Sequence, residues 1–138
     1  MPLHPMLVHY PIAFTMLAAI FQLLAVIFRR QSLMLSSVVA LGLGALMAVS
    51  AAFTGTAQEE VIRSLPGIGA HLDRHASLGT LSAWLLSAGS LAALYLYLKQ
   101  RLPPGLFLAG LLLATALVLV TGHFGAELVY RFGAGAPR

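Results

Sequence analysis

Four long apolar runs divide the chain, and formal charges stand only at or between their ends. The charge-free segments are residues 7–28, 32–57, 76–98 and 102–126. Each is longer than the roughly 20 apolar residues with which a helix crosses the hydrocarbon core of a bilayer. A helix is also the only open-chain form that satisfies its own backbone groups in lipid. The pattern predicts transmembrane helices over residues 6–28, 33–56, 74–98 and 104–126.

The connections between the runs predict two helical hairpins. Residues 29–32 and 99–104 are tight turns, and Pro104 suits the first turn of a helix. Residues 58–74 form the one long loop, which carries the breaker cluster Pro66-Gly67-Ile68-Gly69. We therefore expect an all-α membrane protein, a single domain over residues 1–138 built as an up-down-up-down four-helix bundle of two hairpins. Beyond this alternation we find no internal sequence repeat.

Composition supports the membrane class and excludes several kinds of site. Hydrophobic residues make up 59% of the chain and charged residues 9%, whereas a soluble domain carries about 25% charged residues. Because there is no cysteine, disulfides, iron–sulfur ligation and thiolate–metal sites are excluded. The net charge is only +4 and no basic run is longer than Arg29-Arg30, so we expect the lipid bilayer and no nucleic acid as a partner.

The distribution of basic residues predicts the orientation in the membrane. Both tight turns carry only positive charges, from Arg29, Arg30, Lys99 and Arg101. Cytoplasmic loops are enriched in Lys and Arg. We expect a multi-pass protein of the inner (cytoplasmic) membrane, with the tight turns in the cytoplasm and both termini extracytoplasmic.

Five histidines gather at the predicted extracytoplasmic ends of the helices. They are His4, His9, His71, His75 and His123. His71 and His75 are spaced to share one helix face, which continues to Gly79, where a flat ligand would find room. His9 and His75 lie at similar shallow depth inside their apolar runs. Neutral imidazole is a ligand for haem iron, copper and zinc, so this grouping predicts a shallow cofactor site.

Several ligand sets fit the sequence. A bis-histidine haem b needs two histidines at matched depth, which His9 and His75 provide, and His123 with His71 or His75 is a second option. A copper or zinc site would use three or four of the five. His4 and His71, near loop ends, fit equally well as interfacial residues that hydrogen-bond water or headgroups. We choose His9 and His75 as ligands, because ionisable residues inside the membrane are functional candidates by default, and keep His123, His71 and His4 as alternates.

Pro11 bears on the direction of His9. Its missing N–H leaves the carbonyl of Leu7 without a helical partner, which predicts a kink that would aim His9 inward. The alternative is a simple helix-start motif, since proline is common in first turns.

The opening segment His4-Pro5-Met6-Leu7-Val8-His9-Tyr10-Pro11-Ile12-Ala13 resembles that of the domain of unknown function 2231 family, His-Pro-x-x-Val-His-Phe-Pro-Ile-Ala. Only Tyr10 departs from it. His75 matches a later family histidine. Residues 125–133 resemble the closing pattern Gly-Gly-x-Leu-Val-Tyr-x-His-Gly, except that Ala126 replaces a glycine and Phe132 replaces the histidine. If that histidine is a ligand in the family, His123 would be its substitute here.

The resemblance implies a redox role, because relatives fused to Rieske or cytochrome c type domains point to membrane electron transfer. Our leading hypothesis is a b-type haem protein that exchanges electrons with a quinol or an extracytoplasmic cytochrome c. The alternatives are a non-haem copper or zinc protein and a structural or assembly subunit of a larger membrane complex. No catalytic triad or phosphate loop can be assembled, so we expect a redox subunit, as a homo-oligomer or within a larger redox complex, rather than an enzyme on its own.

Overall fold

The computed structural model describes residues 3–134, and these are helical with no strand. The helices are α1 (Leu3–Leu7), α2 (His9–Phe28), α3 (Gln31–Arg63), α4 (Gly69–Leu98) and α5 (Pro104–Phe132). Four segments are long and apolar enough to cross a membrane, namely His4–Phe28, Gln31–Arg63, Gly69–Leu98 and Pro104–Phe132. The all-α class and the four apolar helices are thereby confirmed.

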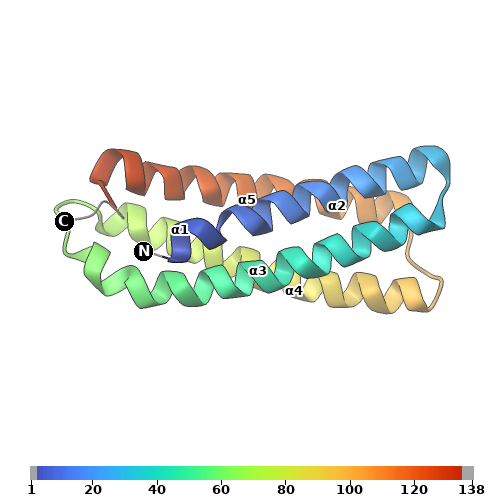
Figure 1. The fold of residues 1–138 in the computed structure, drawn as a ribbon, viewed down its shortest axis with the longest axis horizontal. Coiled ribbons are helices and arrows are strands. Elements are labelled where there is room, and N and C mark those ends of the chain that lie inside the picture. The colour runs from blue at the N-terminus through green and yellow to red at the C-terminus, as the bar shows by residue number, and fades with distance from the viewer. Residues whose placement is uncertain (1–2, 135–138) are drawn as a thin grey trace.

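The four long helices lie side by side along one axis (Figure 1). Helix α3 packs against α2 and α4, and α5 packs against the same two. The α2–α3 and α4–α5 connections lie at one end of the bundle, which we call the turn end. Helix α1, the α3–α4 connection and the end of α5 lie at the other, which we call the histidine end.

Small side chains fill the centre of the bundle, and large apolar ones cover its outside. The buried core is rich in alanine, including Ala18, Ala45, Ala48, Ala83 and Ala93. Such residues let membrane helices approach closely. On the outer surface Phe53, Trp84 and Leu113 expose 74%, 72% and 73% of their area. An apolar exterior around a small-residue core is the distribution that a lipid environment favours, because lipid solvates large apolar side chains.

The first apolar run is interrupted near its beginning. Helix α1 ends at Leu7, Val8 is a turn residue, and α2 begins at His9 with Pro11 in its first turn. The interruption lies where Pro11 cannot donate a hydrogen bond to the carbonyl of Leu7, as the sequence predicted. Beyond the break α1 packs mainly on α3. The short helix therefore turns the residues before Val8, rather than His9, toward α3.

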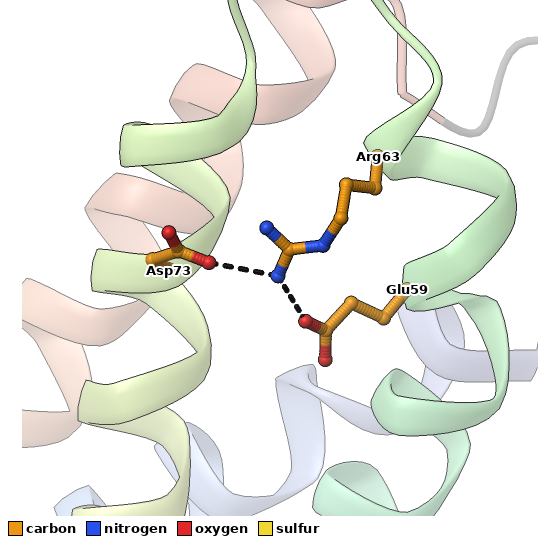
Figure 2. A network of polar contacts seen from close by, with 3 residues as sticks. All are labelled: Glu59, Arg63 and Asp73. Carbon is orange, nitrogen blue, oxygen red and sulfur yellow. Dashed lines mark hydrogen bonds and ion pairs between the residues drawn. The ribbon is translucent and has the colours of Figure 1, made fainter.

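The long loop is shorter than the predicted residues 58–74. Helix α3 continues to Arg63 and α4 already begins at Gly69. Charged side chains support both extensions, because Arg63 donates hydrogen bonds to Glu59 within α3 and to Asp73 of α4, the latter at 2.7 Å (Figure 2). Helix α3 ends at Arg63, and the chain then turns through the Pro66-Gly67 breaker, where Gly67 has a φ of +74°. Arg63 thus links α3 to α4 at the histidine end.

Candidate functional site

A cavity of about 430 Å³ opens among the helices at the histidine end. Cofactor and ligand pockets in proteins span roughly 300–1,000 Å³, and this volume falls within that range. Three of the five histidines line it, His4, His9 and His75. Gly79 also lines it and has open space where a Cβ would stand. The room beside α4 that the sequence predicted at Gly79 therefore exists.

His4 reaches across from α1 to α3. Its Nδ1 lies 2.8 Å from the carbonyl oxygen of Ala51 and 3.3 Å from Oγ1 of Thr54. The ring is half-buried and rests against Gly55, where an added Cβ would stand 2.9 Å from Cε1 of the imidazole. One turn of α3, from Ala51 to Gly55, thus holds the His4 ring by its Nδ1 and by its edge.

His75 makes the same arrangement between α4 and α5. Its Nδ1 lies 3.1 Å from the carbonyl oxygen of Thr121. The half-buried ring rests against Gly125, where an added Cβ would stand 2.9 Å from Cε1. One turn of α5, from Thr121 to Gly125, therefore holds this ring as α3 holds that of His4.

The two rings meet at the cavity. Their centroids are 6.1 Å apart and their planes are inclined by 76°. A backbone carbonyl can only accept, so each Nδ1 carries the proton, and in neutral imidazole Nε2 then keeps a free lone pair. Histidine that donates one ring N–H to a carbonyl while the other nitrogen stays free is the usual state of a metal-ligating histidine. Each ring therefore keeps one nitrogen, Nε2, with the lone pair that a metal ligand needs.

The remaining three histidines are not part of this facing pair. His9 is exposed, although it lines the cavity. His71 lies with its Nδ1 3.3 Å from Oε2 of Glu127, and its ring centre is 5.0 Å from that of Phe132. His123 is exposed beside Phe124 and is not among the cavity-lining residues. Within residues 3–134 no three histidine, aspartate or glutamate side chains form a group that could hold a metal ion.

The structure changes the ranking of the predicted ligands. His4, rather than His9, lies facing His75 at the cavity. The geometry therefore supports His4 as a ligand better than His9, and the choice of His9 stays a prediction. The carboxylates of Glu59 and Asp73 bond to Arg63, so neither orients a histidine of the pair.

Residues 1–138 match the protein family described as "Predicted membrane protein (DUF2231)". The chain belongs to this family. No curated protein and no solved structure matches the chain. Family membership confirms the resemblance seen in the opening motif and agrees with four helices that could span a membrane. The family description says only that its members are predicted membrane proteins, so the chemistry of the cavity is inferred from the residues that line it.

The sequence did not reveal the residues that His4 and His75 contact. Gly55 was not distinguished from the many small residues that membrane helices use for packing, and Gly125 was noted only as the first residue of the family's closing pattern. The carbonyls of Ala51 and Thr121 have no sequence signature, because every residue carries one. What could have drawn attention to the glycines is their place near the histidine end of α3 and α5, one helix turn beyond residues that face the cavity.

Proposed function

We propose that this chain is a membrane b-type haem protein that transfers electrons, with His4 and His75 as the two ligand residues. The observation that carries the proposal is the facing pair of imidazoles. Both lie at one cavity, both have Nδ1 engaged by a backbone carbonyl, and their ring centres are 6.1 Å apart. Each imidazole would hold the haem iron through its Nε2, at the roughly 2.0–2.1 Å at which a histidine nitrogen binds a metal.

The number of ligands favours haem over a bare metal ion. Structural zinc sites take four protein ligands and catalytic ones three, while the described side chains offer a facing pair. Haem brings its own four nitrogen ligands and requires the protein to supply only the axial ones. A cavity of about 430 Å³ with a largely apolar lining also suits a macrocycle better than a hydrated ion.

The position of the pair supports electron exchange at one membrane surface. Charged residues surround the histidine end, among them Glu59, Arg63, Asp73, Glu127 and Arg131, so the cavity lies close to water. A bound haem would supply a one-electron Fe(III)/Fe(II) couple there. Because the basic residues of the turn end favour the cytoplasm, we place this couple at the extracytoplasmic face, with a quinol or a soluble cytochrome c as the partner.

The test is the absorption spectrum of the protein, expressed with a haem supply and purified in detergent. We expect a Soret band and, after reduction, the sharp α band of a low-spin bis-histidine haem. His4→Ala and His75→Ala should each abolish the low-spin spectrum, while His123→Ala, as a matched control, should keep it. Loss of the spectrum in His9→Ala with retention in His4→Ala would replace His4 by His9 as the ligand.

Two outcomes would overturn the haem proposal. A protein without a Soret band after haem-replete expression cannot be a b-type cytochrome. Stoichiometric copper or zinc in that protein, lost in His4→Ala and His75→Ala, would instead support the non-haem metal alternative, for which the same two imidazoles would be the ligands.

A further inference from the structure

The glycines of the long helices differ in what an added Cβ would meet, and at Gly44 and Gly122 it would stand 3.1–3.4 Å from neighbouring side chains. At Gly42, Gly79, Gly89, Gly105 and Gly110 an added Cβ would meet nothing within 4 Å. At Gly55 and Gly125 it would stand 2.9 Å from Cε1 of a histidine ring, closer than real Cβ atoms approach. Both nitrogens of each ring follow at 3.2–3.6 Å. The Nδ1–Cε1–Nε2 edge of each imidazole therefore lies directly on the backbone of a glycine.

Each of these glycines follows, by one helix turn, the carbonyl that accepts from the same ring. Ala51 and Gly55 serve His4, and Thr121 and Gly125 serve His75. The two hairpins thus contain equivalent units of histidine, carbonyl and glycine, although the sequence shows no repeat. Two independent contacts in each unit, one at Nδ1 and one at Cε1, fix both the place and the rotation of the ring.

We propose that Gly55 and Gly125 are positioning residues, which seat the two imidazoles so that their Nε2 atoms address one metal centre between the hairpins. The proposal deepens the haem site proposed above and rests on it for the identity of the metal centre. A methyl group at either position would push the ring edge away from the helix and carry Nε2 with it. Since the carbonyl still holds Nδ1, the ring would rotate rather than leave.

The first experiment needs no cofactor. Thermal unfolding of the purified apoprotein is measured for Gly55→Ala alone and combined with His4→Ala, and for Gly125→Ala alone and combined with His75→Ala. Alanine stabilises a helix relative to glycine, so each substitution should raise the melting temperature once its histidine is gone. With the histidine present it should lower the melting temperature. Gly89→Ala, which meets open space, is the control and should not respond to either histidine.

A melting temperature that rises in Gly55→Ala and in Gly125→Ala, with both histidines present, would overturn the proposal. Such a result would mean that the rings do not rest on these glycines, whatever the cavity binds. Because the cycle compares each substitution with and without its histidine, a general defect in folding would appear in both backgrounds and would count against the proposal too.

The second experiment uses the haem-loaded protein. We expect Gly55→Ala and Gly125→Ala to lose haem roughly 10-fold faster, as when an outer contact of a metal ligand is removed. They should also shift the g values of the ferric low-spin signal, which report the orientation of the two imidazole planes, while Gly89→Ala changes neither. A wild-type protein without haem would refute the proposed function alone, since the unfolding cycle still decides the seating. Wild-type haem binding with unchanged signals in both variants would refute the positioning role alone.

Discussion

His4 and His75 reach the same cavity from helices of very different kinds. His75 lies one and a half turns inside α4, which runs unbroken from Gly69 to Leu98. His4 lies on α1, a helix of five residues that the turn at Val8 separates from α2. The two rings make nearly the same contacts, but the helices that carry them differ in length. One ligand is fixed by a long helix, whereas the other is held mainly by what it touches on α3.

Two ligand residues can therefore occupy equivalent positions without being held equally rigidly. Short helices have little stability of their own, so α1 depends on its packing against α3 and on the Ala51 contact of His4. The α4 unit needs no such support. The His4 half and the His75 half of the site should therefore respond differently to the same kind of substitution.

The largest difference is expected between the two glycine substitutions. In Gly125→Ala the unbroken backbone of α4 gives little room, so the His75 ring must rotate about its own side-chain bonds, and overpacking of this kind costs about 1–3 kcal/mol. In Gly55→Ala the strain can be relieved by a small movement of α1 about Val8, so the free energy of unfolding should fall by less than about 1 kcal/mol. Equilibrium unfolding in detergent, followed by helical circular dichroism, measures both. Equal losses would show that α1 is as rigid as α4.

The sequence predicted the helices well because the bilayer sets their length. A charge-free run of more than 20 residues has few alternatives in lipid, so the four runs between the charged turns became α2 to α5. The ends were less certain. Residues 58–63 were assigned to a loop by their charges, but Glu59 and Arg63 form a pair along one face of α3, and the helix ends only at Arg63.

The histidine pair could be predicted only in part. Depth along a helix follows from the residue number, and it correctly grouped the histidines at one end. The direction in which a side chain points depends on the helix before it, and the break at Val8 changes that direction between His4 and His9. Pro11 signalled the break, but which of the two histidines would face α3 depends on how α1 docks, a tertiary contact that one sequence does not encode locally.

A middle-sized effect is expected from Pro11→Ala. The new N–H can bond to the carbonyl of Leu7, so α1 and α2 should join into one helix and draw His4 away from Ala51. His75 should be unaffected. We expect haem affinity to fall by roughly 10–100-fold, as for loss of an outer contact of a metal ligand, with a spectrum that shows one histidine ligand in place of two. Haem titration and the visible spectrum measure this. Pro104→Ala at the turn end is the control, and unchanged affinity in Pro11→Ala would mean that the break does not place His4.

The smallest effect is expected at Thr54, the one polar contact that His4 makes and His75 lacks. Its hydroxyl lies 3.3 Å from Nδ1 of His4, and it also donates to the carbonyl of Ala51, so it competes for the acceptor that His4 uses at 2.8 Å. Thr54→Val keeps the shape, removes the weaker contact and leaves the carbonyl to His4. The change in free energy of unfolding should therefore stay below about 1 kcal/mol.

Thermal unfolding and the rate of haem loss measure the effect, with Thr115→Val as the control, since its hydroxyl bonds only to Leu111 within α5. A small effect would show that the Ala51 carbonyl and Gly55 suffice to hold His4, as Thr121 and Gly125 do for His75. A loss as large as that in His4→Ala would contradict this equivalence. In that case α1 would need a third contact to hold His4, and the two halves would reach the same ring geometry by different means.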